Sequence, residues 1–239
     1  MGELLEQVPE DWSRALAIVA HPDDLEYGVA SAVAKWTAAG KWVGYVLASR
    51  GEAGIDLWPP ERTAPVREAE ERESARIVGV ETVEFLDYPD GVIEYGLPLR
   101  RDLARAIRRH RPEVLVTINF DLAFAGGMLN QADHRAVGLA AGDAARDAGN
   151  RWIFPELVAE GLASWSGVRY VLVGGVPEPT HACDVTGLLE RGIASLQAHQ
   201  AYLEHLGGFD PEAFLRSEAA AAGARLRCEH AVAFALLRV

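Results

Sequence analysis

Short apolar runs alternate with longer amphipathic stretches along the first 150 residues of this 239-residue chain. The apolar runs predict buried β-strands, at about residues 15–19, 42–48, 82–86 and 114–118. The stretches between them have helical spacing, at about residues 25–39, 64–78, 97–110 and 133–150. This alternation predicts an α/β protein: a three-layer, Rossmann-like doubly wound fold whose mainly parallel sheet has helices on both faces.

The pattern after residue 150 is less regular. Strands are expected at about 170–174 and 231–239, and helices at about 187–205 and 211–225. No stretch is rich enough in Pro, Gly or Ser to divide the chain. We therefore expect a single domain over residues 1–239, with a Rossmann-like core at about 13–150 and a C-terminal elaboration at about 151–239.

Chain order also predicts which loops meet. In the usual doubly wound strand order, 3-2-1-4, the first and fourth strands are neighbours, and ligands bind beyond their carboxyl ends. The loop after the first strand, residues 20–26, should therefore lie beside the loop after the fourth strand, residues 119–134.

The first of these loops concentrates charge against an apolar sheet. Residues 20–26 read Ala-His-Pro-Asp-Asp-Leu-Glu, with three acids and one imidazole within six positions. Burying so much charge without a partner is unfavourable, so a metal or a cationic ligand is expected. If the chain turns helically after Pro22, His21 and Asp24 share a face, and Asp23 points about 100° away. One carboxylate could then bind a metal while its neighbour handles protons; the alternative is a turn whose acids cap a helix.

The second loop offers a further ligand, His134, although a lone histidine at a helix start is often structural. Two imidazoles and one carboxylate, with a fourth position for water, form the ligand set of a catalytic zinc site. Imidazoles favour Zn²⁺ over magnesium or calcium. Asp23 is then the expected general base for a water molecule activated by zinc. Asp133 is expected to orient an imidazole or Asp23.

The net charge and the cysteine content limit the classes of binding partner and the cellular location that we expect. The formal net charge of −12 argues against nucleic acid and against an anionic membrane surface. The acidic residues 1–7 carry no apolar signal segment, and no apolar stretch is long enough to span a bilayer. Cys183 and Cys228 are expected to be reduced thiols of a cytoplasmic protein.

Several segments resemble one known family. Residues 20–26 are similar to the AHPDDxE signature of the LmbE/PIG-L family of zinc-dependent N-deacetylases, which remove acetyl groups from N-acetylglucosamine units and related amides. Residues 49–54, Ser-Arg-Gly-Glu-Ala-Gly, resemble its (T/S)xGExG loop. The similarity continues in order through Arg67 and Glu70 before 78–80, Phe85-Leu86 with Asp90-Gly91, Asp133-His134, and 184–186 with His199.

The resemblance implies a zinc site with one general base: His21, Asp24 and His134 as ligands, and Asp23 as the base. It also implies that Arg50 faces the substrate, at a hydroxyl or phosphate beyond the sugar. The alternative for Arg50 is a salt bridge that fixes its loop. Asp90 is a second expected substrate contact, and Glu52 is expected to hold the loop.

One position departs from the family pattern. The family box commonly begins with a histidine that assists the tetrahedral intermediate or protonates the leaving amine, and this chain has Gln131 there. A glutamine amide can donate a hydrogen bond to an oxyanion but cannot shuttle a proton. Either Asp23 performs both proton transfers, or another imidazole does. His181 and His199 are the candidates, each with a purely structural role as the alternative.

These features predict a zinc-dependent hydrolase that removes an acetyl or other acyl group from the amide nitrogen of an N-acetylglucosaminyl conjugate or a similar small molecule. Association into a homo-oligomer would resemble the family. The main alternative is a catalytically impaired sugar-binding module of the same fold. A nucleotide-binding Rossmann protein is disfavoured because no G-x-G-x-x-G follows the first strand.

Overall fold

The computed structural model describes residues 3–208 and 210–239, so Met1 and Gly2 of the acidic N-terminal stretch, and Phe209, lie outside the description. The strands in the described residues are β1 (Glu6–Gln7), β2 (Arg14–Val19), β3 (Trp42–Leu47), β4 (Thr82–Phe85), β5 (Val114–Ile118), β6 (Tyr170–Gly174), β7 (His181–Asp184) and β8 (Ala231–Arg238). The helices are α1 (Ala30–Ala38), α2 (Pro60–Ile77), α3 (Leu97–His110), the 3₁₀ turn η1 (Ala125–Gly127), α4 (Ala132–Gly149), α5 (Pro155–Ala159), α6 (Leu189–Gln197), α7 (Gln200–Glu204) and α8 (Pro211–Leu226). Of these helices, none combines the length and apolar character needed to cross a bilayer.

All of the described strands belong to one sheet, in the order β1-β7-β8-β6-β5-β2-β3-β4. Its pairings are parallel except those of β8, which runs antiparallel to β6 and β7. The segment β4-β3-β2-β5 confirms the strand order 3-2-1-4 expected from the sequence. Because β2 pairs with β5, the loops that follow these two strands are neighbours.

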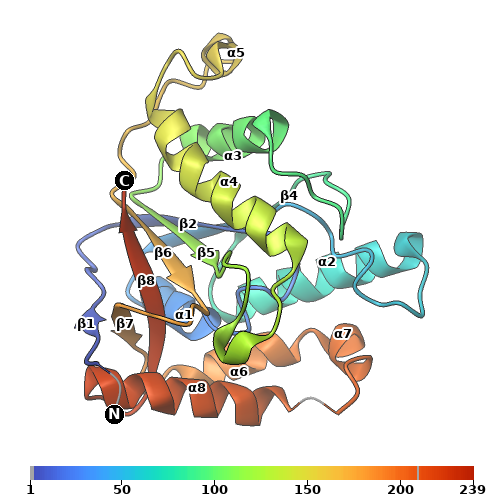
Figure 1. Cartoon of the computed structure of the whole chain (residues 1–239), viewed down its shortest axis with the longest axis vertical. Helices are drawn as coiled ribbons and strands as arrows, with labels where there is room; N and C mark the ends of the chain where they lie inside the picture. The colour runs from blue at the N-terminus through green and yellow to red at the C-terminus, as the bar shows by residue number, and fades with distance from the viewer. Residues whose placement is uncertain (1–2, 209) are drawn as a thin grey trace.

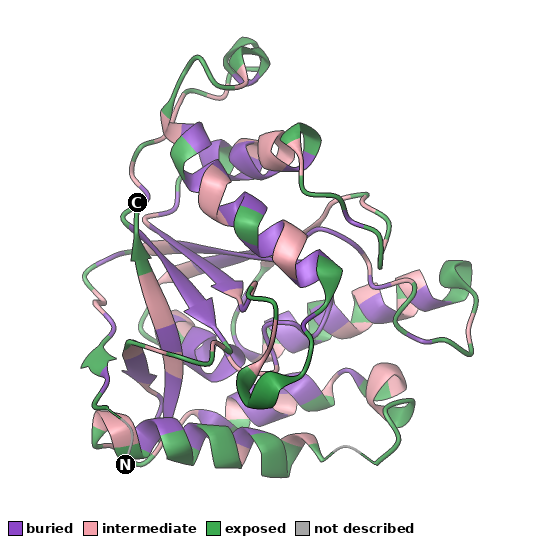
Figure 2. Ribbon diagram, viewed as in Figure 1, coloured by how far each residue is buried: buried purple, intermediate pink, exposed green. Residues whose placement is uncertain are grey.

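The sheet is covered on both faces, as expected for a doubly wound α/β fold. Ala17 and Val19 of β2 pack with Trp36 of α1 on one face. Leu16 and Ile18 point the other way and pack against α3 and α4. Figure 1 shows α3 and α4 lying together over the sheet, and Figure 2 shows that the strands between the layers are mostly buried.

The helix expected at 25–39 begins later than predicted, at Ala30. Residues 22–29 form successive turns instead, and Asp23 has a left-handed backbone with φ of 85°. The Asp24 carboxylate accepts the backbone N–H groups of Ala20 and His21, both at 2.9 Å. Short acidic side chains that bond locally in this way compete with helix formation, which is why the amphipathic pattern extends beyond the helix.

The structure differs from the prediction in other places as well. The helix expected at 187–205 is broken into α6 and α7 at His199, whose ψ of 55° is not helical and whose side chain is fully buried. The sequence pattern also missed β7, and β1, whose two residues are too few to show a period. Together with β6 and β8, these strands extend the same sheet beyond the core.

Candidate metal centre and catalytic cleft

The side chains of His21, Asp24 and His134 meet where β2 and β5 end. His134 Nε2 lies 3.0 Å from Asp24 Oδ1, and His21 Nδ1 lies 3.7 Å from the same oxygen. All three side chains are buried, and their potential ligand atoms lie within 4.8 Å of one another. The strand order thus brings together residues that are more than a hundred positions apart in the chain.

The hydrogen bonds of the two imidazoles leave one nitrogen of each directed at this centre. Asn130 Oδ1 lies 2.8 Å from His134 Nδ1 and can accept its proton, which leaves Nε2 with a lone pair. This Nε2 is buried, and the described residues offer it no hydrogen bond. When Nδ1 carries the ring proton, Nε2 presents a lone pair 3.0 Å from the Asp24 carboxylate, and a cation bound to both groups would satisfy them. The donor set therefore fits a transition-metal ion.

His21 is oriented in a corresponding way by carboxylates. Its Nε2 lies 2.9 Å from Asp90 Oδ1 and 3.2 Å from Asp133 Oδ2, so Nδ1 is the nitrogen left facing Asp24. A carboxylate behind a ligating histidine is a common arrangement, since it fixes the tautomer and the ring direction. Despite burial, which favours the neutral ring, Asp24 and the other carboxylates raise the pKa of His21 well above its ordinary value.

The same carboxylates tie two loops to the centre. Asp133 accepts the backbone N–H of Gly91 at 2.7 Å. Asp90 accepts that of Ala53 at 2.8 Å, and its own backbone N–H donates to Glu52 Oε1 at 2.9 Å. Glu52 therefore holds the position of Asp90, and hydrogen bonds connect both loops to the candidate metal centre.

Asp23 and Asp24 occupy different electrostatic environments. Burial is the largest cause that raises the pKa of Asp23 to about 6, with Asp24 adding to it and Arg67 opposing it. For Asp24, the neighbouring His134 and His21 outweigh burial and lower the pKa far below its usual value. Asp24 is therefore an anion, whereas Asp23 can bind and release a proton near neutral pH.

Arg67 is a site residue whose role the sequence analysis missed. Its buried guanidinium donates to Asp23 Oδ1 at 2.9 Å and to Gly51 O at 3.2 Å. A Cβ at Gly51 or Gly54 would lie 2.3 or 2.2 Å from Arg67 Nη1. The glycines of the 49–54 loop thus make room for Arg67, and their spacing, together with an arginine on the next helix, was the available signal.

A buried polar network lies behind Asp23 and was also missed. Glu71 Oε2 accepts the backbone N–H of Asp23 at 3.2 Å, and Glu26 Oε1 accepts the Ser74 hydroxyl at 2.7 Å. Burial raises the pKa of Glu71 and raises that of Glu26 to about 7. The Glu71 carboxylate thus stabilises the turn at Asp23, where the backbone has a positive φ.

The histidines considered as proton donors lie elsewhere. His199 is fully buried, with Nε2 3.7 Å from Glu71 Oε2, and burial lowers its pKa to about 3. His181 lies on β7, 2.8 Å from the Thr180 hydroxyl. Among the residues that the structure describes, the lining of the catalytic cleft includes neither histidine. The structure does not bring them to the candidate centre.

Arg50 also points away from this centre. Its guanidinium donates to Asp87 Oδ1 at 2.7 Å and to Glu68 Oε2 at 3.1 Å. It too is missing from the described lining of the cleft. These contacts match the alternative reading, in which Arg50 fixes its loop through salt bridges.

The candidate centre lies in a cleft of about 900 Å³ that includes Asp23, Asp90 and Gln131 in its wall. Gln131 occupies the position before α4, and its side chain is exposed. Because it lines the cleft, its amide stays a candidate hydrogen-bond donor to a bound ligand.

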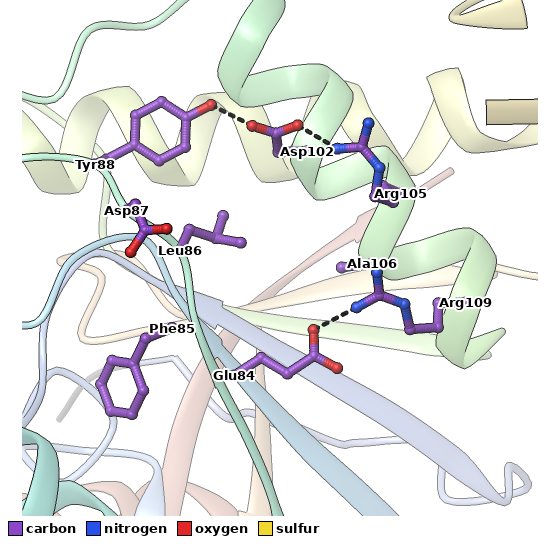
Figure 3. Close-up of a pocket in the computed structure, with 9 residues that line it drawn as sticks. All are labelled: Glu84, Phe85, Leu86, Asp87, Tyr88, Asp102, Arg105, Ala106 and Arg109. Carbon is purple, nitrogen blue, oxygen red and sulfur yellow. Dashed lines mark hydrogen bonds and ion pairs between the residues drawn. The ribbon is translucent and has the colours of Figure 1, made fainter. Parts of the chain in front are cut away.

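A smaller pocket of about 330 Å³ lies between the end of β4 and α3 (Figure 3). Its arginines are already paired: Arg105 with Asp102, and Arg109 with Glu84. The arginine charges of this pocket are therefore balanced by carboxylates within it.

The comparisons with known proteins agree with this geometry. The family model described as PIG-L, GlcNAc-PI de-N-acetylase, matches residues 16–145, which include the three candidate ligands. The chain belongs to the PIG-L family. This PIG-L protein is 28% identical over 197 residues to diacetylchitobiose deacetylase of Thermococcus kodakarensis, across 80% of this chain and 70% of the relative.

Two further similarities cover most of the PIG-L chain. It is 28% identical to 1D-myo-inositol 2-acetamido-2-deoxy-alpha-D-glucopyranoside deacetylase of Kineococcus radiotolerans, across 78% of this chain and 68% of the relative. Its fold matches that of N,N'-diacetylchitobiose deacetylase from Pyrococcus horikoshii with a TM-score of 0.84, at 24% identity, over 96% of this chain and 85% of that one. The predicted family and fold class are thereby confirmed.

Proposed function

We propose that this PIG-L protein is a zinc-dependent hydrolase that removes an acetyl or other acyl group from the amide nitrogen of an N-acetylglucosaminyl conjugate or a similar small molecule. The observation that carries the proposal is the pair of imidazole nitrogens left directed at Asp24, beside a second carboxylate, Asp23, in an open cleft. The two curated relatives support it, since each is named as a deacetylase of an acetylated sugar.

In this proposal His21 Nδ1, Asp24 and His134 Nε2 would hold the Zn²⁺ ion. Zinc bound there would act as a Lewis acid and lower the pKa of water from 15.7 to about 7. Asn130, Asp90 and Asp133 keep the two imidazoles in the required tautomers.

Asp23 is the proposed general base and acid. It accepts a proton from the attacking water, whose oxygen bonds to the acyl carbon, and returns that proton to the nitrogen as the C–N bond breaks. The products are a carboxylate and an amine. A pKa near 6 suits both transfers, because the group must gain and lose a proton at neutral pH.

The remaining cleft residues position the substrate and the base. Arg67 orients Asp23, and Gln131 donates a hydrogen bond to the oxyanion. Asp90 is proposed to contact a sugar hydroxyl from the cleft wall. The histidines among the described lining residues are His21 and His134, and both are proposed zinc ligands. We therefore assign both proton transfers to Asp23.

The test measures acetate release from a panel of N-acetylglucosaminyl conjugates by the zinc-loaded protein. Asp23→Asn should abolish release and keep its zinc, whereas His134→Ala should lose zinc. A sugar-binding module would bind the panel without releasing acetate. Undiminished release by Asp23→Asn, or full zinc content in His134→Ala, would contradict the assignment.

The proposal extends to the molecule as a whole. We propose that residues 1–239 act as one catalytic domain, because β6, β7 and β8 continue the sheet of the core. The two free thiols support a cytoplasmic location. Homo-oligomer formation stays an expectation, which light scattering of the purified protein would test.

A further inference from the structure

The catalytic cleft extends well beyond the candidate metal centre. Its polar part contains Asp90, Asn119 and Gln131, around the proposed ligands. The same cavity continues along the inner face of α8, past Leu215 and Ala222. We call this second part the apolar arm; its further walls include Val232 of β8, and Val176 after β6. The two parts form one cavity of about 900 Å³.

The apolar arm gains room from three alanines among the α8 residues that line it, Ala219, Ala221 and Ala222. Ala219 and Ala222 are buried, at 5% and 8% exposure. Figure 1 shows α8 lying along the end of the molecule towards which β5 and β6 point. The helix is anchored at its start by Asp210, whose carboxylate accepts the backbone N–H of Ala213 at 3.0 Å. Larger residues on the inner face of α8 would fill the arm.

The distribution of polar groups indicates which part of a substrate enters the arm. Sugar hydroxyls lose free energy on burial unless they find hydrogen-bond partners, and the polar part of the cleft provides them. The charged residues that line the arm, Glu218 and Arg225, belong to α8, and Arg225 already donates to Glu3 O at 2.9 Å. An amide carbonyl at the metal centre, with its sugar in the polar part, would direct its acyl group into the arm.

We infer that the apolar arm binds the acyl chain of the substrate, and that the preferred substrates are N-acyl amino sugars with a linear chain longer than acetyl. This inference rests on the proposed function and deepens it. Water supplies the oxygen that bonds to the acyl carbon, the C–N bond breaks, the chain leaves as a fatty carboxylate, and the proton goes to the amine. A cavity of about 900 Å³ lies within the range of about 300–1,000 Å³ that holds ligands much larger than an acetyl group.

The test is a chain-length series. The kcat/KM of the zinc-loaded protein is measured on glucosamine carrying an N-acetyl, N-butyryl, N-hexanoyl or N-octanoyl group. Each buried methylene should increase kcat/KM by about fourfold, so hexanoyl should exceed acetyl by more than tenfold. The octyl glycoside of N-acetylglucosamine, with the alkyl chain on the sugar, is the comparison. A flat or falling series, or a gain seen with the octyl glycoside alone, would overturn the inference.

Two variants of α8 provide a matched pair. Ala222→Phe places a ring in the apolar arm and should reduce the ratio of octanoyl to acetyl kcat/KM by at least tenfold. Ala220→Phe makes the same change on the exposed side of α8, away from the described lining, and should leave the ratio unchanged. Equal ratios in the two variants would contradict the assignment of the arm.

A binding measurement separates failure of this inference from failure of the proposed function. Calorimetry on zinc-loaded Asp23→Asn compares N-octanoylglucosamine with N-acetylglucosamine in the absence of turnover. Tighter binding of the octanoyl compound by more than tenfold, lost in the double variant with Ala222→Phe, supports the arm even if no amide is hydrolysed. Equal affinities overturn it even if acetate is released.

Discussion

The adjacent carboxylates of Asp23 and Asp24 differ because their partners differ. Asp24 faces two imidazoles and stays ionised, whereas Asp23 is buried against a single guanidinium, with its pKa raised to about 6. The two side chains point to different partners because of the turn that follows β2, in which the Asp23 backbone is left-handed with φ of 85°. Neighbouring residues of one type thereby acquire the separate tasks of ligand and base.

At Gln131 we expect a change in turnover rather than in binding. Gln131→Ala should lower kcat by about tenfold to a thousandfold, because it removes a hydrogen-bond donor to the oxyanion, while KM stays within about threefold. Steady-state kinetics of the zinc-loaded protein measures this split. Gln131→His, which restores the residue typical of the family, should retain at least the wild-type kcat. A wild-type kcat in Gln131→Ala would exclude the role.

The residues of the centre differ in how far the sequence could predict them. His21, Asp24 and His134 were expected together, because a local motif and the strand order place them, and the structure does bring them together. Arg67 could not be assigned a role, because its contact with Asp23 depends on how the 49–54 loop folds over α2. For Arg50 the sequence left two readings, and its contacts match the salt bridge.

At the scale of elements, two glycines of α4 should respond to substitution in opposite ways. A Cβ at Gly142 meets nothing within 4 Å, so Gly142→Ala should raise the free energy of unfolding by about 0.5–1 kcal/mol through helix propensity. A Cβ at Gly138 would lie 2.6 Å from Phe120 Cβ, so Gly138→Ala should lower it. Urea denaturation measures both. Equal effects would show that the helix does not pack on Phe120 as described.

The end of α3 is linked to β4 by an ion-pair cluster whose effect depends on pH. Glu84 lies 2.7 Å from His110 Nε2 and 2.8 Å from Arg109 Nη1, and the bond from His110 is the main cause of its lowered pKa. The stabilisation is therefore complete above the ordinary pKa of 4.5 and is lost as the pH falls through the lowered value.

Glu84→Gln should accordingly lower the free energy of unfolding at pH 7 by about 1 kcal/mol, and by much less at pH 3. Denaturation at both pH values provides the measurement. Glu81→Gln, an exposed neighbour just before β4, is the control and should have little effect at either pH. A difference that persists undiminished at pH 3 would exclude the ion-pair explanation.

Helices and strands with a long hydrophobic pattern could be predicted from the sequence. The strands β2, β3 and β5 and the helix α3 lie where the hydrophobic pattern placed them. The starts of α1 and α7 were not predictable, because Asp24 and His199 make tertiary or local side-chain contacts that override the helical period. A strand as short as β1, with two residues, has no hydrophobic period of its own, and it forms only through its pairing with β7.

For the whole molecule, the proposed zinc site should couple metal binding to stability. Two of its ligands follow β2 and the third begins α4, so a bound ion links separate parts of the fold. At a hundredfold excess over its dissociation constant, zinc should add about 2.7 kcal/mol to the free energy of unfolding. For a chain of this size, that corresponds to an increase in Tm of about 5–10 °C.

Differential scanning fluorimetry with zinc and with a chelator measures the shift. The shift should vanish in His134→Ala and persist in His181→Ala, which removes a histidine outside the cleft. Loss of the shift in both variants would mean that zinc acts through general histidine binding, which would contradict the proposed site.

The left-handed backbone at Asp23 decides how an inactive form should be made for capturing bound ligands. Asparagine tolerates φ of 85° at least as well as aspartate, whereas alanine at that position adds backbone strain to the loss of the carboxylate. Asp23→Asn should therefore keep the turn that presents His21 and Asp24 and remain suitable for crystallisation with an intact substrate. An alanine variant would distort the pocket that such an experiment is meant to show.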